Sequence, residues 1–216
     1  MKTGIRHIIV GYLILLPYLD TKAQELRLGI NYEKNILPKL EIDSKVQLRK
    51  VMNQSNAYYA IVQAGLDYEL SENISFSGSV RYTTSPVEID EETVDGINEK
   101  LRYVADFRLK TKRLRNDIKI SNRLRYQHSA IFMDDNRNYI RNKLSVEYRL
   151  NQGMKPFIAV EPYLLLEEQR IRKLRFYLGS EFELFNSEFE LCFIIEGQSM
   201  DEVITIFHKV GIHYKL

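Results

Sequence analysis

Apolar and polar residues alternate along most of the chain. In the stretch RNKLSVEYRL, residues 141–150, aliphatic and aromatic side chains take the even positions from 144 to 150, and charged or polar side chains take the odd positions. Successive side chains of a β-strand point to opposite faces of a sheet. The pattern therefore predicts a strand with one apolar and one charged face, and no window shows the spacing of an amphipathic helix.

Eleven segments show this alternation, and most contain about nine to thirteen residues. They are residues 26–33, 39–49, 58–70, 74–82, 101–110, 118–127, 141–150, 156–166, 173–184, 189–197 and 203–216. A tilted strand that crosses a bilayer needs about nine to eleven residues, whereas strands of soluble proteins usually contain about five or six. The segment lengths thus favour an all-β fold whose strands span a membrane.

Closure of a barrel constrains the number of strands. Bacterial single-chain barrels have even strand numbers, so eleven segments indicate either that the first is not a full strand or that one of them contains two strands. We predict a transmembrane, antiparallel, up-and-down β-barrel of about 10 to 12 strands, with twelve preferred. Such a barrel leaves no open sheet edge.

The connections between segments also suit a membrane barrel. Short polar links at residues 71–73, 151–155 and 186–187 alternate with longer ones at residues 85–98 and 128–138. Outer-membrane barrels have short turns on the periplasmic rim and longer loops outside the cell. The sequence therefore predicts the same division here.

The charged face of the strands has to be assigned to water or to a lumen. Alternation alone also fits a soluble sandwich. An arginine or lysine that faced lipid would cost about 2–4 kcal/mol near the bilayer midplane, so a membrane barrel must turn these charges inward. Buried charges must be paired, and near equality of basic and acidic residues suits a neutralised lumen. The predicted lumen charge network consists of Arg81, Arg108, Arg123, Arg125, Arg141, Glu147, Glu161, Arg175 and Glu181.

The beginning of the chain has a different pattern. Basic residues precede an apolar run of 12 residues, 8–19, and the small residue Ala23 follows. This predicts a secretory signal peptide over residues 1–23 and a barrel over residues 24–216. A retained membrane anchor or a buried helix is the alternative, but the run is shorter than the roughly 20 residues that a membrane-spanning helix needs.

Charge and cysteine content exclude several classes. Without residues 1–23 the chain keeps 28 basic and 28 acidic residues, which argues against a nucleic-acid binder because such binders rely on excess positive charge. Cys192 is the one cysteine of the chain, so the sequence offers neither a disulfide framework nor a cysteine-based metal site.

Two polar segments are candidates for chemistry. Ser129 with His128 as its base would suit a hydrolase, although adjacent residues on an extended chain point in opposite directions. Acidic residues near Asp134 and within residues 90–95 are spaced unlike any known Ca²⁺ loop. We therefore predict no catalytic residue, no metal site and no cofactor.

Pro162 lies inside the alternating segment 156–166. Proline has no N–H group to donate to a strand ladder, so it is confined to edges and bulges of sheets. We expect a bulge or an interruption of strand pairing at this residue.

Six motifs carry a resemblance to a known family. The chain resembles the domain-of-unknown-function family 2490 in VRYT (80–83), DFRLK (106–110), RLRYQ (123–127), YIRNKLSVEYRL (139–150), PFIAVEPYLLL (156–166) and RFYLG (175–179). That resemblance, which covers nearly the whole predicted barrel, implies an exported bacterial protein, mostly from Bacteroidetes, that lies in the outer membrane. It also implies outer-membrane lipid and the barrel assembly machinery as partners, and we expect a monomer.

The sequence leaves the activity open among three classes. An outer-membrane barrel with a structural, surface-interaction or narrow-transport role is favoured. A barrel hydrolase or protease acting at the outer rim is the second class. A soluble, lipocalin-like ligand binder is the third, and it requires an apolar interior and a charged exterior.

Overall fold

The period-two alternation produces eleven β-strands. The computed structural model describes residues 25–51, 58–86, 97–111, 117–131, 136–150, 153–184, 187–200 and 203–215. The strands are β1 (Glu25–Leu37), β2 (Leu40–Val51), β3 (Tyr58–Ser71), β4 (Ile74–Pro86), β5 (Ile97–Lys110), β6 (Ile118–Ile131), β7 (Arg137–Tyr148), β8 (Met154–Leu165), β9 (Arg170–Leu184), β10 (Ser187–Met200) and β11 (Val203–Lys215). Among these described residues no helix has the length and apolar character needed to cross a membrane.

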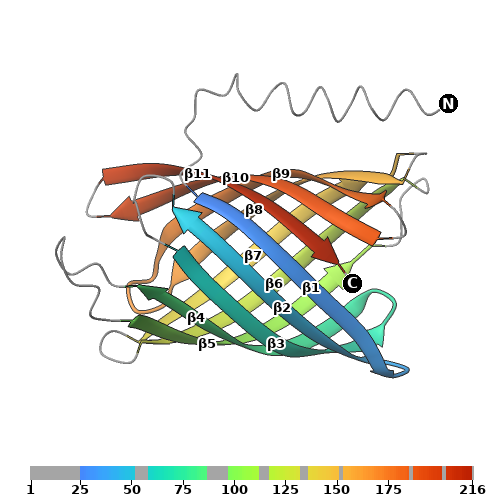
Figure 1. Ribbon diagram of the computed structural model, residues 1–216, viewed down its shortest axis with the longest axis horizontal. Coiled ribbons are helices and arrows are strands. Elements are labelled where there is room, and N and C mark those ends of the chain that lie inside the picture. Colours follow the sequence, from blue (N-terminus) through green and yellow to red (C-terminus); the bar gives the residue numbers. More distant parts are fainter. Residues whose placement is uncertain are drawn as a thin grey trace.

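The strands close into a barrel in which each strand pairs with its neighbours in the chain. Every sequential pair is antiparallel, and the ring is closed by a parallel pairing of β1 with β11, with Arg27 opposite Gly211 and Leu28 opposite Ile212. Figure 1 shows these two strands side by side and pointing the same way. The ladder is therefore continuous around the barrel, without an exposed edge.

The preference for twelve strands is wrong, because the eleven alternating segments correspond to eleven strands. An even number is needed only when every neighbouring pair, including the closing one, is antiparallel. A parallel closing pair satisfies the backbone donors and acceptors of both strands with slanted hydrogen bonds. The consequence is that β1 begins at one rim and β11 ends at the other.

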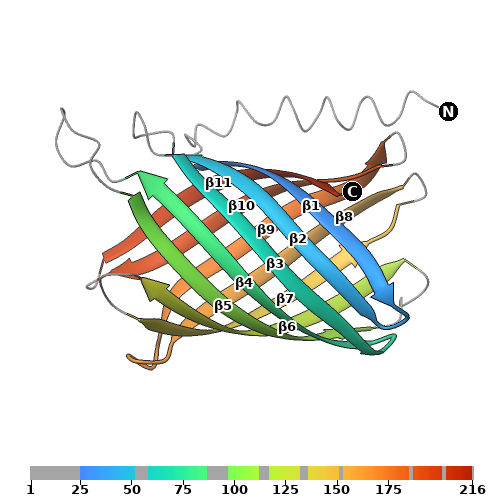
Figure 2. The same cartoon turned by 60° about the horizontal axis from the view of Figure 1, so that its bottom comes forward.

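The strands run obliquely from one rim of the barrel to the other (Figure 2). The links between strands are on average shorter at one rim than at the other, although 111–117 and 201–202 are exceptions. We call the end where β1 meets β2 the short-turn rim; its links are residues 38–39, 72–73, 111–117, 149–153 and 185–186. The opposite end is the long-loop rim; its links are residues 52–57, 87–96, 132–136, 166–169 and 201–202. The predicted loop 128–138 is too long at both ends, because β6 continues to Ile131 and β7 begins at Arg137.

The barrel is apolar outside and polar inside. Within the described residues 13 buried side chains are polar or charged and eight are hydrophobic, the reverse of the usual preference. Each strand exposes a large apolar side chain: Leu28, Val46, Val62, Val80, Leu109, Leu124, Leu144, Ile158, Leu178, Ile195 and Ile206. This is the opposite of what a lipocalin-like binder requires.

Pro162 interrupts the ladder as expected. Between β7 and β8 the pairs on either side of it, Arg141 with Tyr163 and Leu144 with Val160, keep their register, and the two intervening pairs are missing. On its other side, β8 pairs with β9 with a register shift between Tyr163 and Leu164. The missing N–H of proline accounts for the gap.

Gly179 on β9 occupies a place where the wall is tightly packed. A Cβ atom there would lie 2.6 Å from the carbonyl oxygen of Leu191 and 2.6 Å from the ring of Phe157. By contrast, a Cβ atom at Gly197 on β10 would have no atom within 4 Å. The two glycines therefore form a matched pair for testing the packing of the wall.

We predict that Gly179→Ala lowers the free energy of unfolding by about 1–3 kcal/mol, because overpacking forces backbone shifts. Gly197→Ala should leave it unchanged or slightly raised, since alanine loses less backbone entropy on folding. Urea-induced unfolding of both variants in detergent micelles measures the difference. Equal midpoints for the two variants would contradict this packing.

Candidate functional site

The lumen contains a cavity of about 310 Å³ whose wall is strongly basic. Twelve arginine and lysine side chains line it, against one carboxylate, that of Glu190. These side chains reach the cavity because they take the inward positions of the alternating strands. The carboxylates that pair with part of this charge are not among the residues that line the cavity; they are Glu25, Asp106, Glu161 and Glu196.

Glu161 on β8 is the centre of the first ionic group. Its side chain is 0% exposed. Its Oε1 accepts hydrogen bonds from the Nη2 atoms of Arg123 and Arg141, at 3.0 and 2.9 Å. Its Oε2 accepts hydrogen bonds from the hydroxyls of Tyr163 and Tyr177. Both carboxylate oxygens of Glu161 are thus satisfied, which a buried charge requires.

Tyr163 holds two of the surrounding guanidinium groups in place. The guanidinium of Arg141 lies 4.2 Å from the ring centroid, and that of Arg175 lies 4.6 Å from it. Arg175 also donates a hydrogen bond to the Tyr163 hydroxyl. A rigid aromatic ring between two cations fixes their positions through cation–π attraction.

A second ionic group lies on β3, β5 and β6. The Nε and Nη2 atoms of Arg125 each donate a 2.6 Å hydrogen bond to Asp106, one to each oxygen. Arg108 forms an ion pair with Asp67 and lies 3.5 Å from Asp106. The bidentate geometry around Asp106 is the strong form of an arginine–carboxylate pair.

A third ionic group crosses the closing seam of the barrel. Lys209 on β11 bridges Glu196 on β10, at 3.1 Å, and Glu25 on β1, at 3.3 Å. Glu196 also pairs with Arg175, and Glu25 pairs with Arg27 at 2.6 Å. The parallel closing pair of strands is therefore reinforced by ion pairs on the lumen side.

A fourth ionic group lies near the short-turn rim. Lys155 contacts Glu188 at 2.9 Å and Glu181 at 3.9 Å. Lys215 contacts the same two carboxylates at 3.7 and 3.5 Å. On average these side chains are more exposed than those of the first three groups, so their contribution to stability is smaller.

The nine residues of the predicted lumen network are distributed as follows. Glu161, Arg123, Arg141 and Arg175 belong to the first group, Arg108 and Arg125 to the second, and Glu181 to the fourth. Arg81 donates hydrogen bonds to the amide oxygen of Gln63. Glu147 lies toward the short-turn end of β7, opposite Lys119 in register.

Several lumen residues were missing from the predicted network. They are Arg27, Lys45, Arg49, Lys100, Lys143, Lys173 and Lys209, together with Tyr163 and Tyr177. Each of them lies an even number of positions from the other inward-facing residues of its strand, and this spacing is the sequence signal that identifies it. The alternation of inward and outward positions does not reveal that the basic residues gather around one cavity and that the acidic residues do not.

The hydrolase candidates do not form a catalytic pair. Ser129 is 0% exposed on the inner face, where the side-chain amide of Gln127 donates to its hydroxyl at 3.1 Å. His128 lies on the other face, beside the ring of Tyr103 and 2.9 Å from the side-chain oxygen of Asn138. Both are strand residues, so their side chains diverge.

The acidic candidates for calcium, Asp134 and the carboxylates of residues 90–95, lie outside the described residues. In the part of the chain that the structure describes, no three His, Cys, Asp or Glu side chains gather in a way that would hold a metal ion.

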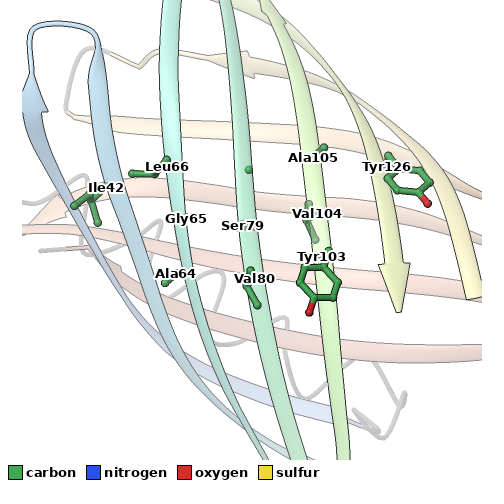
Figure 3. A pocket seen from close by; sticks show the side chains of 11 residues that line it. Ile42, Ala64, Gly65, Leu66, Ser79, Val80, Tyr103, Val104, Ala105 and Tyr126 are labelled. Carbon is green, nitrogen blue, oxygen red and sulfur yellow. The ribbon is translucent and has the colours of Figure 1, made fainter. Parts of the chain in front are cut away.

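A larger hollow of about 720 Å³ lies on the outer face and carries no charge (Figure 3). Its small residues are Ala64, Gly78 and Ala105 on β3, β4 and β5, with Gly78 opposite Ala105 in register. Larger apolar side chains, including Leu66 and Tyr103, surround them. Its lining contains no carboxylate and no charged nitrogen, and its side-chain polar groups are the hydroxyls of Ser79, Tyr103 and Tyr126, so this hollow offers mainly contact with apolar groups.

These features define a closed β-barrel with an ionic interior and an apolar exterior. The chain belongs to the DUF2490 family, described as proteins of unknown function, whose family model matches residues 27–202. No curated protein is significantly similar to the chain. The resemblance inferred from the sequence motifs is thus confirmed.

We predict that Glu161→Gln lowers the free energy of unfolding by about 3–5 kcal/mol, because Arg123 and Arg141 would stay buried without their anion. Glu168→Gln is the matched control. Glu168 lies in the exposed turn between β8 and β9 and pairs with Arg170 and Arg172 at the start of β9, where an ion pair contributes little. Urea-induced unfolding compares the variants, and a similar midpoint for both would contradict the role of Glu161.

Proposed function

We propose that this protein is an outer-membrane β-barrel with a narrow-transport role. The membrane location is supported by the exposed apolar surface, to which every strand contributes. Soluble monomers rarely expose contiguous apolar patches of more than a few hundred Å². A surface of this kind around a whole barrel is the expected lipid-facing surface of a membrane β-barrel.

Tyrosines on the outer face support the same assignment. Tyr32, Tyr68 and Tyr148 are exposed toward the short-turn rim, and Tyr58 is exposed at the start of β3, at the long-loop rim. Their rings are suited to the interface between hydrocarbon and headgroups, where membrane barrels carry aromatic girdles. Tyr139, which also lies near a strand end, lines the lumen cavity and is not part of the girdle.

The lengths of the links between strands indicate how the barrel is oriented in the outer membrane. In outer-membrane barrels the short turns lie on the periplasmic side and the longer loops lie outside the cell. The short-turn rim, with the end of β11, is then periplasmic, and the long-loop rim, with the start of β1, faces outward. The proposal includes insertion by the outer-membrane assembly machinery, surrounding outer-membrane lipid and a monomeric barrel.

A transport role is supported by the space inside the lumen. Ion pairs cross the interior, so a wide aqueous channel is not expected, but the cavity of about 310 Å³ is large enough for a small solute. A purely structural barrel would not need a cavity lined by so many like charges. The role we propose is passage of small solutes along this basic lumen.

We predict that Val46→Arg, at a 54% exposed position in the middle of β2, destabilises the barrel in lipid vesicles by about 2–4 kcal/mol. Leu37→Arg, at a 60% exposed position at the end of β1, should cost only about 0–1 kcal/mol, because it lies near the interface. Unfolding from vesicles measures both. If neither arginine changes stability, the outer face does not contact hydrocarbon.

Cell fractionation tests the location. We expect the chain in the outer-membrane fraction, with a gel mobility that changes on heating because the folded barrel resists detergent. Recovery as a detergent-free soluble periplasmic monomer would contradict the proposal.

A further inference from the structure

The charges of the lumen are not evenly neutralised. Several cations that line the cavity have a carboxylate partner, for example Arg125 with Asp106 and Arg123 with Glu161. Six others have no carboxylate within ion-pair distance among the described residues: Lys45, Arg81, Lys100, Arg102, Lys143 and Lys173. These six come from β2, β4, β5, β7 and β9, so they approach the cavity from several sides of the wall.

The unpaired cations are also close to one another. Arg81 lies within electrostatic reach of Arg125 and Arg102, and Lys100 lies within reach of Arg102 and Lys173. Partners other than carboxylates are few: Arg81 donates to Gln63, and the Lys143 ammonium lies 4.2 Å from the Tyr177 ring centroid. From beyond ion-pair distance Glu190 attracts Lys45 and Lys143, and Glu196 attracts Lys173. Arg81, Lys100 and Arg102 are instead repelled by neighbouring cations, which is unfavourable unless a counter-charge enters.

Some donors of the wall are unused. The Nε of Arg102 and the Nη2 of Arg27 are buried and have no hydrogen-bond acceptor among the described residues. The Nε atoms of Arg123 and Arg141 are in the same condition, although both arginines pair with Glu161 through Nη2. Buried donors are normally satisfied, so these four arginine side chains keep hydrogen-bonding capacity that their present partners do not use.

We propose that this cavity is a binding site for a small multivalent oxyanion, a solute that carries two or more carboxylate or phosphate groups. Guanidinium groups bind such oxygens with two parallel hydrogen bonds, and ammonium groups add point charges. Several cations on opposing sides of the wall favour a multivalent anion over a monovalent one. This proposal rests on the proposed transport role, because it names the class of solute that would be transported. Binding at the site requires only the folded barrel.

The test uses the chain folded in detergent, with pyrophosphate and citrate as probes and acetate as a monovalent control. Isothermal titration should show saturable binding of at least one multivalent probe, with acetate bound at least tenfold more weakly, and with affinity that falls as salt is added. Binding of pyrophosphate alone assigns the site to phosphate groups, and binding of citrate alone assigns it to carboxylates.

The variants Arg81→Gln and Arg102→Gln each remove a cation that has no carboxylate partner. Each should weaken binding about tenfold or more, and the double variant should weaken it further. Both should leave the empty barrel as stable as the parent or more stable, because repulsion is relieved. Arg170→Gln, at the exposed first residue of β9, is the matched control and should bind like the parent.

A second measurement, of ion selectivity, tests the transport role separately from binding at the site. Reversal potentials across planar bilayers should show a preference for anions that the double variant loses. Weak, non-saturable binding equal for all probes, or equal affinity of the double variant and the control, would overturn the site even if the barrel inserts and conducts. Failure to insert, with saturable binding intact in detergent, would overturn the transport role and leave the site standing.

Discussion

The structure depends on placing ionised side chains inside a closed wall. A chain with this many inward charges cannot pack a conventional hydrophobic core, so its strands are held by a continuous hydrogen-bond ladder and by ion pairs across the lumen. Because side chains alternate along a strand, a slip by one residue would move every arginine of that strand to the outer face. The registers of β6 and β7, which carry Arg125 and Arg141, are therefore fixed by charge as much as by hydrogen bonds.

The closing seam illustrates how this constraint and the strand number are linked. Eleven strands close only if one neighbouring pair is parallel, and that pair is β1 with β11. Lys209 lies at this seam and bridges carboxylates on both sides, at Glu25 and Glu196. An ion pair across the junction adds to the slanted hydrogen bonds of a parallel ladder, which are slightly less stable per residue than antiparallel ones.

Much of the fold is predictable from the sequence because alternation is a local property. The position of each segment, the inward face of Glu161 and the disturbance at Pro162 all follow from residues a few positions apart. The interaction partners of these residues cannot be predicted from such local patterns. Arg125 meets Asp106 because the β5–β6 register brings them together, and Glu161 meets both Arg123 and Arg141 because the wall curves. The parallel closure and the gathering of unpaired cations depend on the whole ring, which no local pattern reveals.

The central claim is that aliphatic side chains contact lipid while their charged neighbours face a lumen. The chain contains no tryptophan, so a single introduced indole reports its own surroundings. Leu144→Trp and Lys143→Trp place this probe at adjacent positions of β7, on opposite faces. In vesicles with brominated acyl chains, the account predicts strong fluorescence quenching for Leu144→Trp and little for Lys143→Trp. Quenching that is equal at the two positions, or stronger at 143, would contradict it.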